Sequence, residues 1–543
     1  MEHCAKTAKV AAKSVFEPEK NVALPIKSKY NSSKSILPLW SGKSKEHSMI
    51  TFLLGIAGLV LGYVIYGAVV DKIFKPSSTF KTPAMKKDAD GVDFVPMNWK
   101  KVMLIQFISI AGTGPIFGAI AGALWGPVAY LWIIFGCIFA GAVHDYFSGM
   151  LSVRSNGGSV SEVVGKYLGN VPRNIMRVFS IVLLILVGAV FTTTPALIFD
   201  DVIASPGAGV HTNFYFIAIA VIIVYYIIAT ITPINKIIGR IYPAFGILLT
   251  FTGVAIFLML FVRGYMVGAP ELVLRNVHPA GTMIFPFLFI TIACGAISGF
   301  HATQSPLMAR CIRNEKEGRK VFYGSMILEG FIAMIWAAAA MTFFANREGG
   351  LVAALPAPNV VTQVSLGLLG PIIGTIVIIG VMFFPITSGD TAFRAARLIL
   401  ADSFKFSQKP ILNRFILAIP LFVIGIILCL PFVDFDILWR YFAWSNQSLA
   451  TIVLWAAAAY LAKTGKSYWI ALIPATFMTT VVVSFIMIAP IGFRLPYTAG
   501  VIGGIVAAAA LFVVFVYFVV IKQRGTLIEE ERRLLEEGSK ETA

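Results

Sequence analysis

Residues 102–122 decide the fold, and their sequence is VMLIQFISIAGTGPIFGAIAG. A helix that crosses a hydrocarbon core of about 30 Å needs about 20 mostly apolar residues, and this stretch has that length and composition. Its centre, Ile110-Ala-Gly-Thr-Gly-Pro115, holds two glycines and a proline. Proline removes one helical hydrogen bond and clashes with the preceding turn. We therefore expect the helix to break near the middle of the membrane.

A second apolar segment carries a similar interruption about five spans later. Residues 292–301 have the sequence IACGAISGFH, which places glycines and a serine at the corresponding depth. Backbone groups freed by a break cost several kcal/mol each against lipid, so paired breaks are kept where they line a cavity. Small residues also permit close helix packing, which is the alternative for either break alone. The pair predicts a substrate site formed by Gly112, Thr113, Gly114, Pro115, Gly295, Ser298 and Gly299.

The composition excludes a soluble fold. Hydrophobic residues make up 58% of the 543 residues and charged residues 13%, and the mean hydropathy is +0.83. An ordinary soluble domain carries about 25% charged residues. The net charge of +17 comes from lysines and arginines in short loops and in the two tails. This placement indicates membrane topology and contact with anionic lipid, not nucleic-acid binding.

Apolar runs recur along the chain and predict about 13 transmembrane helices. Their expected limits are about 50–70, 102–122, 127–150, 173–199, 214–234, 243–264, 283–304, 320–344, 370–388, 412–433, 440–462, 467–489 and 497–521. If spans two to six form one unit (about 102–264) and spans seven to eleven another (about 283–462), each unit has five spans. The second unit then enters the membrane with inverted orientation, as in an inverted-repeat transporter with a discontinuous first helix in each half.

Lysine and arginine accumulate in alternate loops, which sets the orientation. The basic loops include residues 72–101, 154–177, 310–320 and 394–414, together with Lys236 and its neighbours. We therefore expect the first span to start outside and the C-terminus to be cytoplasmic. Residues 1–48 hold nine lysines and would face outward. We therefore interpret them either as residues that precede a natural start at Met49 or as a disordered, non-native extension. We expect residues 49–523 to form the transmembrane transporter domain and residues 524–543 to form a cytoplasmic C-terminal tail.

Placing an ionisable side chain within an apolar span costs free energy, so such a residue indicates a functional site. Glu329 lies inside the eighth span and His301 ends the seventh, while Asp390 follows the ninth. We expect these three to serve as proton-linked groups. His144 and Asp145 end the third span, and an interfacial or helix-capping role for them is an open alternative.

Hydroxyl and amide side chains supply two further hypotheses. Thr387, Ser388 and Thr391 lie on a breaking helix and could bind Na⁺ with backbone carbonyls of the second span, although such hydroxyls also cap helices. Asn446 and Gln447 follow an aromatic entrance to the eleventh span. They either bind substrate or join helices by hydrogen bonds.

The sequence does not predict a metal site, a disulfide framework, a cofactor or an enzyme. The five cysteines are scattered without CxxC or Cys/His spacing. Neither a nucleophile elbow nor a P-loop is present.

Several blocks of the sequence strongly resemble the carbon starvation protein (CstA) family. The matching blocks are Thr82-Pro-Ala, Asp90 to Pro96, Ile110 to Pro115, Ala140 to Tyr146, Phe285 to Ala302, Asp390 with Arg394 to Arg397, and Asn446-Gln447. The resemblance implies a carrier in the cell membrane that is related to amino acid/polyamine/cation carriers, with a LeuT-like fold and with peptides or pyruvate as cargo. The loops near residues 345–370 and 490–496 are shorter than in the longer members, so the cargo stays open.

Together these patterns predict a secondary transporter that imports a small organic nutrient with H⁺ or Na⁺. The alternative is a membrane-embedded nutrient sensor that signals through the tail helix around residues 526–540. The sequence leaves the coupling ion, the stoichiometry and the oligomeric state open.

Overall fold

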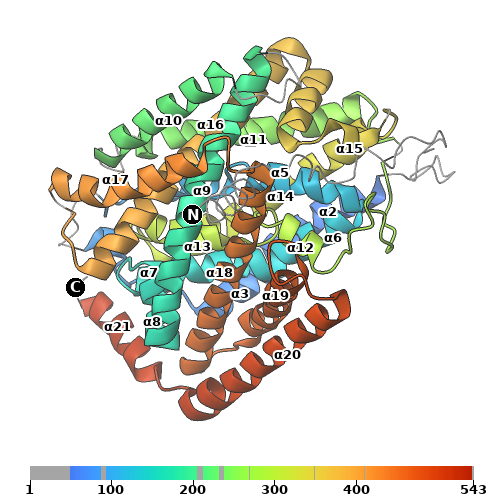
Figure 1. Ribbon diagram of the computed structural model, residues 1–543. Coiled ribbons are helices and arrows are strands. Elements are labelled where there is room, and N and C mark those ends of the chain that lie inside the picture. Colours follow the sequence, from blue (N-terminus) through green and yellow to red (C-terminus); the bar gives the residue numbers. More distant parts are fainter. Residues whose placement is uncertain are drawn as a thin grey trace, which may run out of the picture. The chain divides into compact units, whose positions relative to one another are not determined.

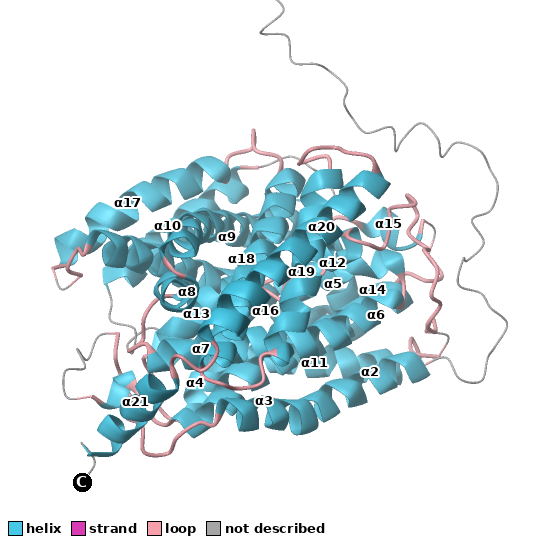
Figure 2. Cartoon of the chain, turned by 90° about the horizontal axis from the view of Figure 1, so that it is seen from below, coloured by secondary structure: helices cyan, strands magenta, loops and turns pink. Residues whose placement is uncertain are grey.

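The computed structural model describes residues 49–86, 93–204, 212–231, 238–267, 269–347, 349–408 and 410–540. Within these ranges the chain forms helices joined by loops and turns, without any strand (Figure 2). The predicted all-α class is confirmed. The predicted extension at residues 1–48 and the loop around Lys236 lie outside the described residues.

The N-terminal half contains the helices up to residue 262. Their bounds are α2 Ile50–Leu61, η1 Gly62–Tyr66, α3 Gly67–Phe74, η2 Pro83–Met85, α4 Trp99–Ala111, α5 Gly114–Gly122, η3 Ala123–Trp125, α6 Val128–Leu131, η4 Trp132–Gly141, α7 Ala142–Arg154, α8 Val160–Leu168, α9 Asn170–Ala204, α10 Asn213–Ile231 and α11 Ile238–Val262. The helices α2, η1 and α3 form one span, as do α6, η4 and α7.

The C-terminal half begins with a short helix before the second interruption. The bounds are α12 Phe287–Thr291, α13 Gly299–Ala309, η5 Glu315–Glu317, η6 Arg319–Tyr323, α14 Gly324–Phe343, α15 Gly350–Ala354, α16 Ala357–Phe404, α17 Ile411–Leu428, α18 Phe435–Lys463, α19 Trp469–Ile488, α20 Tyr497–Phe515, η7 Val516–Ile521 and α21 Ile528–Lys540. Figure 1 shows α19 and α20 side by side near the C-terminal end of the chain.

All thirteen predicted spans contain helix. Among the described residues, ten helices are long and apolar enough to cross a membrane, and the bent pair α4 and α5 brings the number to eleven. The remaining two predicted spans correspond to the interrupted pair α12 and α13 and to α18. Large apolar side chains face outward on the peripheral spans, among them Leu54, Val221 and Val506. Lipid can cover this surface.

Some sequence-based limits were wrong. The helix α16 extends beyond residues 370–388 at both ends, and Gly370, with φ 74°, divides it. Asp390 therefore lies well inside a helix and not at its end. His144 and Asp145 likewise lie in the first turn of α7, which continues to Arg154. Hydropathy does not detect these extensions, because the added turns carry polar residues that are buried in protein.

The spans pack in two groups. In one group, α13 contacts α4 and α7, and α14 contacts α5 and α7. In the other group, α9 packs against α10, α16 and α17. The helices α11 and α18 touch members of both groups. The two groups meet where α16 contacts α4, α5 and α13, which is where the interruptions lie.

Candidate functional site at the two helix breaks

The first break lies between α4 and α5. Gly112 ends α4 with φ 47° and ψ −136°, a conformation that favours glycine. The helix axes before and after it differ by 47°. Pro115 then lies in the first turn of α5, where its missing N–H costs no helical hydrogen bond. The sequence therefore both ends one helix and starts the next, as predicted.

The second break is longer than expected and spans residues 292–298 between α12 and α13. Two side chains of α18 bind the chain at both ends of this break. Asn446 Oδ1 accepts hydrogen bonds from the backbone N–H of Phe300 at 2.6 Å and from Ser298 Oγ at 3.1 Å. Gln447 Nε2 donates to the carbonyl of Phe289 at 3.1 Å. The two amides of α18 thus join helices by hydrogen bonds, which was the alternative to substrate binding. Their contact with a substrate stays a hypothesis.

The two breaks pack directly against each other. A Cβ atom built on Gly114 would lie 2.4 Å from both Cβ and Sγ of Cys294. A Cβ on Gly299 would lie 2.4 Å from the carbonyl oxygen of Asn446. Side chains at either position would push the elements apart. The glycines therefore allow the close approach that brings the predicted substrate residues together.

The N-terminus of α5 has no side-chain cap. It begins beside Thr113, whose side chain is fully buried and whose Oγ1 has no hydrogen-bond partner among the described residues. Ser109 Oγ, one turn earlier on α4, is also buried and unpartnered. Pro115 has no N–H, and the N–H groups of Ile116 and Phe117 donate to the carbonyl of Thr113 at 3.2 and 2.8 Å. The N–H of Gly114 and the helix dipole are therefore what the backbone of α5 offers to an anion at this position. The first break therefore presents hydrogen-bond donors with no acceptor assigned to them.

A buried cluster of ionisable side chains lies next to the second break. His301 Nδ1 is 2.9 Å from Asp145 Oδ2, and His144 Nδ1 is 2.8 Å from Asp145 Oδ1. On its other side, His301 Nε2 is 3.3 Å from Glu329 Oε2. All four side chains are completely buried. Two of the predicted proton-linked groups thus form one cluster, and Asp145 joins them.

Asp390 belongs to a second group at the boundary between the two sets of helices. The hydroxyl oxygen of Tyr242 in α11 lies 2.8 Å from Asp390 Oδ2 and 2.9 Å from the carbonyl oxygen of Thr387, so its one proton is shared between these two acceptors. Ser388 Oγ donates across the boundary to the carbonyl of Ile108 on α4 at 3.0 Å.

The three predicted sodium ligands are therefore not equivalent. The hydroxyls of Thr387 and Thr391 bond to carbonyls within α16, and only Ser388 reaches the helix that carries the first break. A site shared by α4 and α16 would depend mainly on Ser388 and on backbone carbonyls.

A cavity of about 760 Å³ opens on one side of the breaks, lined by α5, α9, α18 and the loop before α18. An aromatic layer separates it from the first break. The ring centroids of Phe117 and Trp439 are 5.9 Å apart, those of Trp439 and Phe442 5.3 Å, and those of Phe442 and Phe191 6.0 Å. Phe191 in turn lies against Gly112. Neighbouring aromatic rings thus connect the wall of the cavity to the first break.

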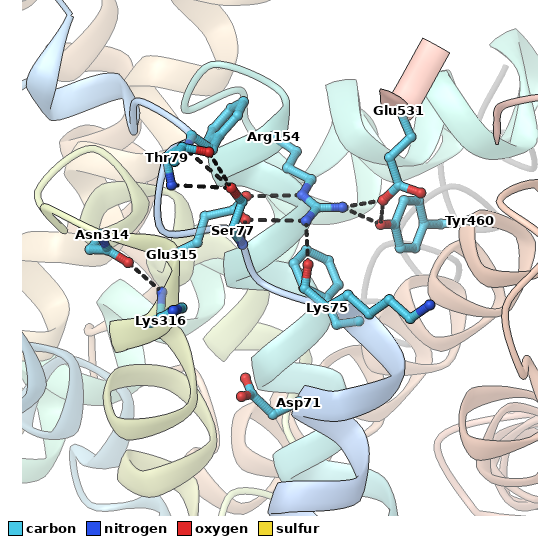
Figure 3. Close-up of polar contacts among 12 residues, drawn as sticks. Asp71, Lys75, Ser77, Thr79, Arg154, Asn314, Glu315, Lys316, Tyr460 and Glu531 are labelled. Atoms are coloured by element: carbon cyan, nitrogen blue, oxygen red, sulfur yellow. Dashed lines mark hydrogen bonds and ion pairs between the residues drawn. The ribbon is translucent and has the colours of Figure 1, made fainter. Parts of the chain in front are cut away.

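A network of charges joins the basic loops around Arg154 and Glu315 (Figure 3). Arg154, at the end of α7, bonds to Glu315 with an Nε to Oε1 distance of 2.9 Å, and it also bonds to Glu531 of α21. Tyr460 and Lys466 donate to Glu531 Oε1 at 2.6 and 2.7 Å. The helix α21 is thus bound to α7 and to the end of α18.

The family model described as "Carbon starvation protein CstA" matches residues 47–231, 217–362 and 337–485. A relative in Haemophilus influenzae, named only as an uncharacterized membrane protein, is 43% identical, covering 55% of this chain and 92% of that protein. The pyruvate/proton symporter BtsT of Escherichia coli is 30% identical, covering 54% of this chain and 48% of that protein. The peptide transporter CstA of Campylobacter jejuni is 27% identical, covering 77% of each.

Two solved structures show the same fold. MhsT in complex with L-phenylalanine aligns with a TM-score of 0.54 and 13% identity, covering 75% of this chain and 98% of that one. A mutant of the Eremococcus coleocola manganese transporter aligns with a TM-score of 0.51 and 10% identity, covering 83% and 99%. This likeness confirms the LeuT-like five-plus-five fold with two discontinuous helices. With the family model matched over most of its length, the chain is a membrane transporter that belongs to the carbon starvation protein CstA family.

Proposed function

We propose that the protein imports a small carboxylate-bearing nutrient across the cell membrane, coupled to an ion gradient, with its C-terminus in the cytoplasm. The observation that carries this proposal is the uncapped N-terminus of α5 beside the unpartnered Thr113 hydroxyl. A carboxylate is the group that pyruvate and peptides share, and half-helix N-termini favour it. Gly112 packs tightly on Phe191 and Gly114 on Cys294, so space at the first break is narrow and favours a small cargo. Pyruvate is therefore the first candidate and a short peptide the second.

The boundary around Ser388 and Asp390 is the proposed coupling site. A coupling ion has to meet different surroundings as the transporter alternates, so it belongs where the two groups of helices meet. Asp390 and Ser388 lie on α16 and face Tyr242 and α4. His301, Asp145 and Glu329 lie on α13, α7 and α14, which pack within one group. Of the predicted proton-linked residues, Asp390 is thus placed best for coupling to H⁺, and Ser388 for coupling to Na⁺.

The first test is uptake of labelled pyruvate and of labelled alanylalanine into proteoliposomes under an imposed H⁺ or Na⁺ gradient. We expect pyruvate to accumulate above its equilibrium level with an inward H⁺ gradient. Asp390→Asn should lose this accumulation and keep exchange of labelled for unlabelled cargo, because the neutral amide cannot carry a proton. Glu529→Gln, on the exposed face of α21, is the control and should behave as the unchanged protein. Accumulation that is unchanged in Asp390→Asn contradicts the assignment.

A second test enlarges the first break. The Cβ of Gly114→Ala would lie 2.4 Å from Cys294, and overpacking of this kind costs about 1–3 kcal/mol. If that cost falls on the transport cycle, the uptake rate drops by about 5- to 150-fold, since 1.36 kcal/mol corresponds to a factor of 10. Gly324→Ala, whose nearest built contact is 3.5 Å, is the matched control. Uptake at the normal rate by Gly114→Leu would remove the substrate assignment.

A third test addresses the sensor alternative, which the docking of α21 on Arg154 favours. In a carrier, deletion of residues 525–543 should leave gradient-driven uptake in place, because Arg154 keeps its two bonds to Glu315 at 2.9 and 3.1 Å. The measurement compares uptake and equilibrium cargo binding in the truncated and the full chain. Binding without uptake in both proteins would instead support the sensor.

A further inference from the structure

Two members of the buried ionisable cluster next to the second break, together with a cysteine of that break, are side chains of the kinds that bind transition metals. Cys294 comes from the non-helical segment of the second break, His301 from α13 and Glu329 from α14. One ligand atom from each lies within 4.8 Å of the others. His301 and Glu329 are fully buried, and Cys294 is 1% exposed. The three groups therefore converge on one point that water does not reach from the surface.

The hydrogen bonds around His301 leave two acceptor atoms facing each other. An ionised carboxylate only accepts, so the 2.9 Å bond to Asp145 places the imidazole proton on Nδ1. In the neutral ring, Nε2 then presents a lone pair. It lies 3.3 Å from Glu329 Oε2 without forming a hydrogen bond, and neither oxygen of Glu329 has a hydrogen-bond partner among the described residues. A shared proton or a bound metal cation between these two atoms would satisfy both of them.

The separation of these two atoms suits a shared metal ion. Nitrogen and oxygen ligands of tetrahedral Zn²⁺ lie about 2.0–2.2 Å from the metal, which places two such ligands about 3.3–3.5 Å apart. The Nε2 to Oε2 distance is 3.3 Å. Metal-bound histidines also commonly donate their other N–H to a carboxylate, which fixes the ring and strengthens the ligand. Asp145 occupies that position.

The sulfur is held in place from the opposite helix. Asn446 Nδ2 donates to Cys294 Sγ at 3.5 Å, and Sγ is 3.6 Å from Ser298 Oγ. Charge gives a further argument, because among the described residues the ion pairs of Asp145 and Glu329 run only to His144 and His301. Buried carboxylates without a compensating cation are costly. A divalent cation bound to a thiolate, an imidazole and a carboxylate would neutralise this charge.

We propose that Cys294, His301 and Glu329 bind a resident divalent cation of the Zn²⁺ class, with Asp145 orienting the histidine. Such an ion joins the non-helical segment of the second break to α13 and α14. Because Gly114 lies against Cys294, the ion also fixes the surface on which the first break packs. The inference concerns the architecture of the site and does not depend on which nutrient is carried.

The test is metal binding by the full-length purified protein in lipid nanodiscs. After removal of metal with a chelator, Co²⁺ is titrated and its spectrum recorded, together with the metal content of the untreated protein. We expect about one metal ion per chain and a thiolate-to-cobalt charge-transfer band. Cys294→Ser should lose the band, and Glu329→Gln should bind Co²⁺ about 10- to 100-fold more weakly.

The control variant is Cys429→Ser, which removes another buried cysteine whose sulfur donates to the carbonyl of Ala189. It should keep both the band and the affinity. The unchanged protein alone decides the main point, so poor folding of a variant does not obscure the result. Failure of the folded, unchanged protein to bind Co²⁺ or Zn²⁺ would overturn the proposal and would indicate a proton shared by His301 and Glu329. A band that persists in Cys294→Ser would overturn the ligand assignment.

Discussion

The structure depends on one constraint, which is that backbone groups released by a broken helix need partners inside a membrane. Each break meets that need from neighbouring helices. Trp132 Nε1 donates to the carbonyl of Ile292 at 3.0 Å, and Asn446 accepts from the N–H of Phe300. At the first break, Ser388 donates to the carbonyl of Ile108. The α5 N-terminus remains without a side-chain cap, and this difference between the breaks is why we propose it as the site of an anionic ligand.

The same partners connect the site to the two groups of helices. Ser388 belongs to α16 and Ile108 to α4, so their hydrogen bond crosses the boundary between the groups. The aromatic layer around Phe191 crosses it as well, since Phe191 of α9 packs on Gly112 and on Phe300, with a ring separation of 5.9 Å in the second case. Movement of one group against the other would alter both contacts at once. A coupling ion bound there would be sensitive to the presence of cargo.

Much of this site could be predicted from the sequence, because helix breaks have a local cause. Gly112 ends α4 because glycine adopts a positive φ readily, and Pro115 cannot continue a preceding helix because it lacks an N–H. Glu329 was expected inside a span and lies fully buried in α14. The pairing of His301 with Asp145 could not be predicted in this way, because the two residues are 156 positions apart and meet only through tertiary packing.

Other features have no local signal in the sequence. Asn446 caps α13 from a helix 146 residues away, and Cys294 joins His301 and Glu329 only after the break has formed. The ligand spacing that identifies many metal sites within one segment is absent when the ligands come from two helices and a non-helical segment. Asp390 was recognised as unusual, although its partner Tyr242 lies on another helix. The sequence therefore predicts where the helices are interrupted, whereas tertiary packing determines which side chains surround the interruptions.

The central claim is that the cargo binds where the two breaks meet. The most direct measurement is a cryo-electron microscopy structure of the full chain in nanodiscs with whichever cargo drives uptake. The account predicts density for the cargo carboxylate at the N–H of Gly114 and the hydroxyl of Thr113, next to the non-helical segment of residues 292–298. Cargo density confined to the cavity lined by Trp439 and Arg440, with none at the breaks, would contradict it.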